Sequence, residues 1–210
     1  MIRLAGRVPN KITVACSGGP DSMVAIDFFI KGKKDVRVAH FDHKTEHSSD
    51  ARSFVEKFCK DRGLELVIGE LLSERQKGQS PEEFWRDHRL KWLHSLDGKV
   101  ATGHHLDDAV EWWIFTSING NGRLIPYANN NIIRPFLLTK KSIIDRWVAR
   151  NNIEHVDDPS NLDVKYARNR IRSNLIPEIL KINPGIHKVV RKKMETQIKN
   201  ETLMMEMPVC

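Results

Sequence analysis

Six consecutive residues near the start of the chain, Ser-Gly-Gly-Pro-Asp-Ser at positions 17–22, have the composition of a phosphate-binding loop. Glycines let backbone N–H groups approach phosphate oxygens closely, and a helix that begins there presents its positive end to them. Ser17 and Ser22 add hydroxyl donors. Asp21 would repel phosphates unless a cation lies between them, and Mg²⁺ binds carboxylate and phosphate oxygens together. The loop therefore predicts a magnesium–pyrophosphate site with Asp21 as a metal ligand.

The same loop lacks two features of other nucleotide-binding loops. It has neither the lysine of a Walker A motif, which reaches the β- and γ-phosphates, nor the G-x-G-x-x-G of a dinucleotide-binding fold. A loop that holds pyrophosphate as a leaving group by amides, serines and a metal-bound aspartate predicts conversion of ATP to AMP. The alternative is a plain turn between a strand and a helix, in which glycine supplies a positive φ.

A second group of polar residues lies in the stretch ATGHHLDDAVEWW at positions 101–113. Its candidate catalytic residues are His104, His105, Asp107, Asp108 and Glu111. Adjacent imidazoles and carboxylates are suited to bind a metal, to position a base or to neutralise a basic substrate, and Asp107 is the second predicted metal ligand. Two alternatives stay open: a mononuclear zinc site, although the spacing is not H-E-x-x-H, and a structural role in which Asp107 caps a helix.

The charge balance indicates a polyanionic partner. The chain has 34 Lys and Arg against 27 Asp and Glu, which gives a formal net charge of +7. Basic side chains bind nucleic acid by releasing counterions from its phosphates. Arg168, Arg170 and Arg172 are suited to such contacts, and Arg86 and Arg89 share one helical face. The alternatives are a solvated basic helix face and surface ion pairs.

Apolar runs alternate with helix-forming segments over the first 118 residues. The expected strands cover residues 11–16, 36–41, 64–69 and 99–103, and the expected helices cover residues 21–31, 49–63, 80–96 and 107–118. Strands separated by such helices predict right-handed crossovers, and hence an α/β fold with a doubly wound, mostly parallel sheet. The group formed by His104, His105, Asp107, Asp108 and Glu111 is called here the His–Asp cluster. It follows the fourth strand, at the edge where ligands bind in open α/β sheets.

The alternation ends near residue 119. The later expected elements are a loop or hairpin, an extended stretch, a helix and a helical C-terminal part, over residues 119–131, 132–137, 139–152 and 171–210. Thr139 is expected to cap the helix. This change predicts two domains, an ATP-binding α/β domain over residues 1–135 and a small, mostly helical extension with an RNA-contacting segment over residues 136–210.

Composition favours an unexported, cytoplasmic protein. The chain is 40% hydrophobic and 29% charged, no apolar stretch approaches the roughly 20 residues of a membrane span, and the first residues lack the apolar core of a signal peptide. Cys16, Cys59 and Cys210 form no C-x-x-C pair, so paired-thiol redox and zinc-knuckle sites are not supported. We expect no membrane association and predict no protein partner.

Three of these stretches resemble motifs of one enzyme superfamily. S-G-G-x-D-S after a first strand resembles the PP-loop of the adenylating ATP pyrophosphatases, which cleave ATP between the α- and β-phosphates. HHLDDAVE resembles the H-H-x-D-D-x-x-E motif of tRNA(Ile)-lysidine synthetases and related tRNA thiolases. Residues 158–177 resemble the lysidine-synthetase signature D-P-[ST]-N…R-N-x-[IL]-R…P, and Arg134 lies in a stretch similar to the R-P-L/F-L segment of that family.

The resemblance implies a role for each matching residue. The residues it assigns to ATP are Ser17, Gly18, Gly19, Pro20, Asp21, Ser22, His40 and Phe41, the last two because VAHFDH is similar to the H-V-[DN]-H segment of the family. The residues it assigns to tRNA are Arg86, Arg89, Arg134, Arg168, Asn169, Arg170 and Arg172. It implies a fold of the adenine-nucleotide alpha-hydrolase type with a short C-terminal helical extension.

The resemblance also implies an activity, with ATP and Mg²⁺ as cofactors. Free L-lysine would be ligated to C2 of the wobble cytidine of a CAU-anticodon tRNA(Ile) through an adenylated base, with release of AMP and pyrophosphate. The alternatives are a tRNA thiolase, although those generally use paired cysteines, another AMP-forming ligase, or a tRNA-binding protein without catalysis. The family threonine is Trp112 here, and the sequence ends where members usually continue, so it resembles a short member.

Overall fold

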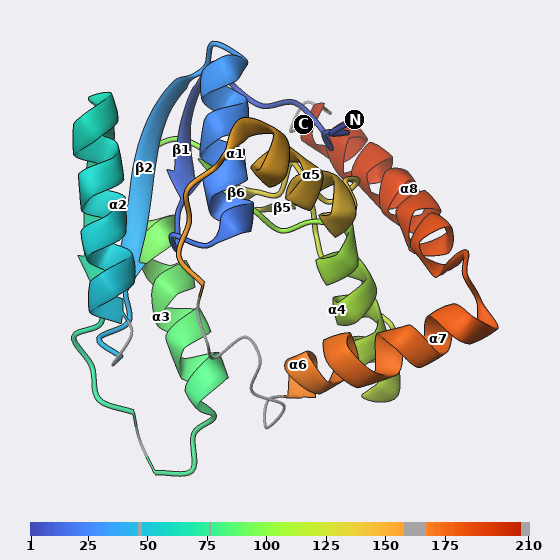
Figure 1. Ribbon diagram of the computed structural model, residues 1–210. Helices are drawn as coiled ribbons and strands as arrows, with labels where there is room; N and C mark the ends of the chain where they lie inside the picture. The colour runs from blue at the N-terminus through green and yellow to red at the C-terminus, as the bar shows by residue number, and fades with distance from the viewer. Residues whose placement is uncertain (46–47, 76, 158–166, 207–210) are drawn as a thin grey trace.

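A six-stranded sheet forms the centre of the computed structural model, which describes residues 1–45, 48–75, 77–157 and 167–206 (Figure 1). The strands are β1 (Lys11–Ala15), β2 (Asp35–Asp42), β3 (Glu65–Glu70), β4 (Val100–Ala101), β5 (Ala128–Asn129) and β6 (Ile132–Ile133). They lie in the order β3-β2-β1-β4-β6-β5, and all neighbours are parallel except β5 and β6. The predicted mostly parallel sheet is confirmed.

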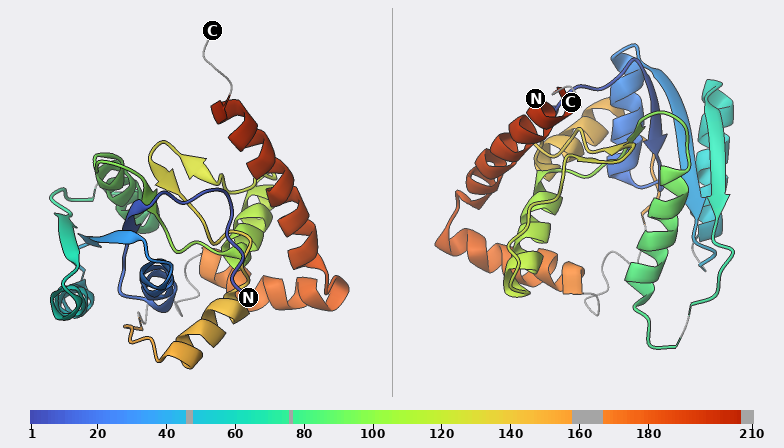
Figure 2. Two further views of the ribbon diagram at one scale, coloured as in Figure 1. Left: turned by 90° about the horizontal axis from the view of Figure 1, so that it is seen from above. Right: turned by 180° about the vertical axis from the view of Figure 1, so that it is seen from behind.

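Helices cover both faces of this sheet. They are α1 (Pro20–Lys31), α2 (Ser48–Arg62), α3 (Pro81–His94), α4 (Leu106–Ile118), α5 (Lys141–Asn151), α6 (Ala167–Arg170), α7 (Ile176–Ile182) and α8 (Ile186–Glu206), with a π-helical turn, Ile171–Leu175, between α6 and α7. Figure 2 shows α1, α2 and α5 on one side of the sheet and α3 on the other. The doubly wound arrangement predicted from the alternating pattern is therefore confirmed.

One continuous hydrophobic core extends past residue 135. Its buried members after that position are Phe136, Leu137, Leu138, Ile144, Ile171, Ile186, Val190, Met194 and Ile198, which join side chains of β1, β2 and α1. Through them α5 packs against α1, and α8 packs against α4. The helices after residue 135 are thus held on the sheet domain by apolar burial, while the two-domain division stays a prediction.

Two local predictions can be compared with the structure. The segment after residue 119 contains the antiparallel hairpin of β5 and β6, as expected for a loop or hairpin. The prediction that Thr139 caps the next helix is wrong, because Lys140 is the N-cap and makes no side-chain capping bond. The Thr139 hydroxyl instead accepts the N–H of Arg3 and donates to its carbonyl, which holds the N-terminal segment. No described helix is long and apolar enough for a membrane span.

The strand order places both predicted motifs together. β1 lies between β2 and β4, so the chain leaves β1 in one direction to form β2 and β3 and later returns to form β4 on its other side. The carboxyl ends of β1 and β4 therefore form a topological switch point, where ligands bind in open α/β sheets. The 17–22 loop follows β1, and His104 and His105 follow β4.

Candidate active site

The loop at residues 17–22 has the open helix start that phosphate binding requires. The first N–H groups of a helix have no intrahelical acceptor. Gly19, the N-cap of α1, offers no side chain to bind them, so they are left for a ligand. The Ser22 hydroxyl donates to the Gly19 carbonyl at 2.9 Å and accepts the N–H of Ser17 at 3.3 Å. Gly18 has a φ of +85°, which glycine adopts without strain. The backbone is thus folded into a compact cradle at a positive helix end.

β2 supports the base of this loop. His40 is buried, and its Nδ1–H donates to the Cys16 carbonyl at 2.9 Å. Burial lowers the pKa of His40, so its ring is neutral. The Phe41 side chain lies against Trp92 of α3, with ring centroids 5.5 Å apart. His40 therefore positions the loop from below, whereas the Phe41 side chain is occupied by packing and only its backbone is left to face a nucleotide.

Gly103 brings the end of β4 against the loop. A Cβ at this position would lie 3.0 Å from the backbone carbonyl carbon and oxygen of Asp21 and 3.1 Å from the Ser22 nitrogen. Those distances are tighter than most Cβ contacts in proteins, so a side chain at this position would push the backbone at Asp21 and Ser22 away by a few tenths of an ångström, and glycine allows the close approach. Sequence reasoning did not assign Gly103 a role, although it directly precedes the two histidines.

His105 is the N-cap of α4, which rules out the alternative in which Asp107 caps this helix. The His105 N–H donates to Asp108 Oδ2 at 2.8 Å, and the Asp108 N–H donates to His105 Nδ1 at 3.4 Å, a reciprocal capping box. Burial would raise the pKa of Asp108, but His105, His104 and Arg172 outweigh it and lower that pKa. Because His105 Nδ1 accepts, the ring proton lies on Nε2, 3.7 Å from Asp21 Oδ1.

Asp21 also contacts a lysine that the sequence did not suggest. Lys141, the first residue of α5, donates from Nζ to Asp21 Oδ1. Its backbone N–H donates to Asp107 Oδ2 at 2.7 Å, so a carboxylate from α4 replaces the missing side-chain cap of α5. One sequence signal points to Lys141. A cation in the first turn of a helix is repelled by the helix dipole, so a lysine at this position indicates a favourable contact elsewhere that offsets the repulsion.

Asp107 joins three helices. Besides Lys141 of α5, its carboxylate accepts the Nε2–H of His187 in α8 at 3.0 Å. Burial would raise the pKa of Asp107, but His187 and the Lys141 N–H outweigh it and lower that pKa to about 2. A charged Asp107 thus holds α5 and α8 against α4, which links the C-terminal helix to the site.

An Asp107→Asn variant is expected to lower the free energy of unfolding at pH 7 by about 1–2 kcal/mol, because it loses the charge on two hydrogen bonds. A carboxyl whose folded pKa is depressed from 3.8 to about 2 stabilises the fold above pH 4 and loses that contribution as the pH falls toward 2. Urea midpoints measured from pH 6 to 2.5 should therefore converge for parent and variant. A constant difference would contradict this account, and the exposed Asp97→Asn is the control.

Glu111 is the buried centre of an ion-pair network. Its side chain is 1% exposed, and it accepts from Arg168 Nε at 2.5 Å and from Arg172 Nε at 3.0 Å. Arg172 also reaches Asp108 Oδ1 at 3.0 Å. Arg168 and Arg172 are four residues apart, and the π-helical turn carries the second of them. Two arginines assigned to tRNA by resemblance are thus bonded to the carboxylates of the His–Asp cluster.

Positive charge surrounds His104. Its Nδ1 is hydrogen-bonded to the Thr102 hydroxyl at 2.7 Å. Burial, together with the nearby guanidiniums of Arg134, Arg89 and Arg168, lowers the pKa of His104 to about 3, although the Asp108 carboxylate acts in the opposite direction. Burial likewise lowers the pKa of Arg89. His104 is therefore an uncharged hydrogen-bonding group beside a concentration of cations.

The remaining basic residues differ in exposure. Arg134 is 6% exposed and donates to the Pro126 carbonyl at 2.9 Å, and burial lowers its pKa to about 10. In this conformation its guanidinium lies inside the protein, not on the surface. Arg86 is exposed and pairs with Asp87 at 3.2 Å, and Arg170 is exposed. Asn169 is half-buried on α6. The part of the signature stretch at residues 158–166 lies outside the described residues.

The two predicted metal ligands differ in their suitability for Mg²⁺. The described contacts of Asp21 all use Oδ1, so Oδ2 is left for a ligand. Mg²⁺ commonly binds through one or two carboxylates together with substrate phosphates, and Asp21 fits that pattern. Both oxygens of Asp107 already accept one hydrogen bond from the protein, which leaves one lone pair on each, and its role as a metal ligand stays a prediction. No group of three or more metal-ligating side chains gathers among the described residues.

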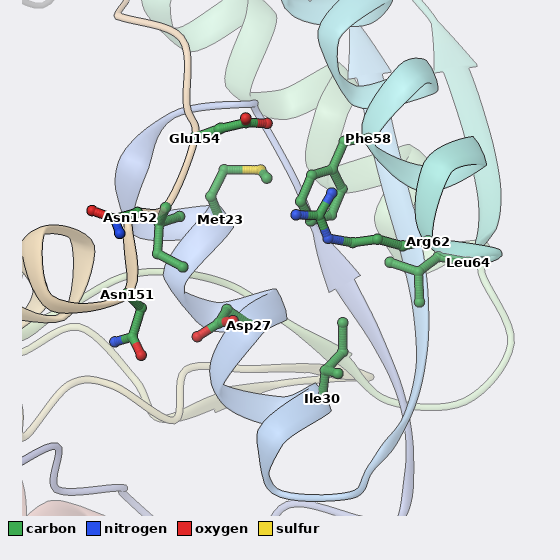
Figure 3. Close-up of a pocket in the computed structure, with 10 residues that line it drawn as sticks. Met23, Asp27, Ile30, Phe58, Arg62, Leu64, Asn151, Asn152 and Glu154 are labelled. Atoms are coloured by element: carbon green, nitrogen blue, oxygen red, sulfur yellow. The ribbon is translucent and has the colours of Figure 1, made fainter.

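A hollow of about 360 Å³ lies elsewhere, between α1, α2 and residues 151–154 (Figure 3). Met23, Asp27 and Ile30 line it from α1, and Phe58 and Arg62 line it from α2. Two of its three charged lining residues make contacts within the protein: Asp27 accepts the Trp147 indole N–H at 2.7 Å, and the guanidinium of Arg62 lies 4.0 Å from the Phe58 ring centroid. The chemistry-bearing side chains are at the switch point and not in this hollow.

Comparison with known proteins places the chain in a family. A model described as the PP-loop domain matches residues 3–179. The chain belongs to the PP-loop domain family. This PP-loop domain is 35% identical over 195 residues to a protein named tRNA(Ile)-lysidine synthase from Persephonella marina, and 32% identical over 196 residues to one of the same name from Thermotoga maritima. The matches cover 84% and 85% of the chain but 43% and 47% of those relatives, so the chain spans less than half of their length.

Solved structures share the fold of this PP-loop domain. The U34-tRNA thiolase NcsA from Methanococcus maripaludis is similar with a TM-score of 0.72 at 17% sequence identity, over 90% of this chain and 72% of that one. The NH3-dependent NAD synthetase from Campylobacter jejuni has a TM-score of 0.52 at 15% identity, over 98% and 91% of the two chains. At such identity the likeness concerns the fold alone, and it confirms the predicted adenine-nucleotide alpha-hydrolase type.

Proposed function

We propose that this PP-loop domain ligates free L-lysine to C2 of the wobble cytidine of a CAU-anticodon tRNA(Ile), at the expense of ATP. The observation that carries the proposal is the bonding of Arg168 and Arg172 to Glu111. These arginines come from the stretch similar to the lysidine-synthetase signature, and Glu111 comes from the helix that begins beside the PP-loop. The names of the 28–35% identical relatives support the same reaction.

The first step is adenylation of the base. The cytosine O2 attacks the α-phosphorus, the bond from that phosphorus to the bridging oxygen breaks, and pyrophosphate leaves. The PP-loop amides and the hydroxyls of Ser17 and Ser22 hold the phosphates at the positive end of α1. Mg²⁺, when bound at Asp21, supplies further positive charge to the phosphates. Fixed donors and charges of this kind stabilise the transition state because they need no reorganisation.

The second step replaces AMP by lysine. The ε-amine of L-lysine attacks C2, the bond from C2 to the phosphate-bearing oxygen breaks so that AMP leaves with that oxygen, and the proton given up by the amine passes to the departing phosphate of AMP. Asp108 and Glu111 are held by arginines, so His104 is the uncharged group of the cluster that is suited to orient the amine by a hydrogen bond. The wobble base must leave its stack to react, and the cations around His104 attract the adjoining phosphates.

Incubation with ATP, labelled L-lysine and a tRNA(Ile) transcript tests the proposal. We expect one lysine in the RNA for each AMP and pyrophosphate released. A transcript with uridine at the wobble position is the matched control and should remain unlabelled, because it lacks the reacting cytosine. Pyrophosphate release that depends on tRNA but yields no lysine incorporation would contradict the proposal, and replacing lysine by a sulfur donor or ammonia then identifies a thiolase or another AMP-forming ligase.

A further inference from the structure

Lys141 connects the two halves of the candidate site. Its Nζ donates to Asp21 Oδ1 at the start of α1 and lies 3.3 Å from Asp145 Oδ1. Its backbone N–H donates to Asp107 Oδ2. The side chain is 32% exposed, so the ammonium is within reach of a ligand. A residue 120 positions after Asp21 thus places a cation at the PP-loop.

The placement of this cation goes against local helix preference. Lys141 is the first residue of α5, where the helix dipole repels positive charge, and the first turn of α5 holds no acidic residue. The ammonium of Lys141 instead contacts the carboxylates of Asp21 and Asp145. The lysine is therefore held at this point by specific contacts with the site.

A negative Asp21 beside phosphates needs a positive neighbour, and the PP-loop itself contains no lysine. We infer that Lys141 binds the phosphates of the nucleotide, and that its ammonium performs from α5 the task that a Walker A lysine performs from within its own loop. Asp21 holds the ammonium in place through Oδ1. The inference rests on the proposed function only for the nature of the nucleotide.

Equilibrium binding of ATP in the absence of tRNA and lysine tests this role. A Lys141→Met variant keeps the backbone N–H that Asp107 accepts but loses the charge. We expect its dissociation constant for ATP to rise about 10- to 100-fold, as for loss of a charge-assisted hydrogen bond. Lys141→Arg should restore binding to within about threefold. Lys140→Met, which removes the exposed neighbouring cation, is the matched control and should bind ATP as the parent does.

Three results would overturn the inference. ATP affinity unchanged in Lys141→Met, with or without a lower melting temperature, would make Lys141 a structural contact only. Equal weakening in Lys141→Arg would show that the charge is not what matters. A parallel loss of affinity for adenosine, measured by competition, would place the effect away from the phosphates. Because no tRNA or lysine is present, these results are independent of whether the domain makes lysidine.

Discussion

An Asp21→Asn variant is expected to lose tRNA-dependent pyrophosphate release about 100- to 1,000-fold, the effect seen when one preorganised charge-stabilising group is removed from an active site. Asp21 belongs to the loop itself and contacts both His105 and Lys141. Asparagine has nearly the same shape but no charge, so it neither holds the ammonium firmly nor binds Mg²⁺ well. Initial rates with saturating lysine and tRNA measure the loss.

The structure offers a matched control for this variant. Asp145 is the other carboxylate on Lys141, at 3.3 Å, but it is an i,i+4 partner on the same helix and its side chain is 57% exposed. Asp145→Asn should change the rate less than about threefold, because exposed ion pairs contribute little. Equal losses in both variants, or a parental rate in Asp21→Asn with a parental melting curve, would remove Asp21 from the mechanism.

The gathering of the two motifs at the switch point was predictable because each motif is a short stretch of sequence. A glycine loop between a strand and a helix, and a His–Asp cluster after a later strand, are both visible as short stretches. Parallel strands place their carboxyl ends at one edge. What sequence could not give is which side chains from distant elements meet there. Lys141 follows Asp21 by 120 residues, and only the packing of α5 on α1 brings the two together.

Residue type was also a poorer guide than burial for the arginines. Arg168 and Arg172 have the charge expected for RNA contacts, yet they lie four apart on one helical face that meets Glu111, where a buried carboxylate requires a counterion. Arg134 lies inside the protein because it directly follows β6, which lies between β4 and β5 in the sheet. The alternative of a cap at Asp107 does not hold, because His105 caps α4 and Asp107 serves another helix.

A Glu111→Gln variant is expected to lower the free energy of unfolding by about 3 kcal/mol, because breaking a buried ion pair leaves charges uncompensated. Glu111 is 1% exposed, whereas Arg172 is 50% exposed, so solvent screening places the effect at the lower end of the range for such pairs. Urea denaturation measures it. Glu178→Gln is the control, since its pair with Lys181 at 2.7 Å is exposed and should contribute under about 1 kcal/mol.

The same network separates a structural role from a functional one. Replacing a buried ionic cluster by apolar side chains of similar volume is often neutral or stabilising, so the triple variant Glu111→Leu, Arg168→Met, Arg172→Met should recover most of the stability that Glu111→Gln loses. If the network only fastens α6 to α4, that variant will also recover lysine ligation. We expect it to stay inactive, because Arg168, which neutralises Glu111, also supplies positive charge beside His104, where we propose that the anticodon phosphates bind.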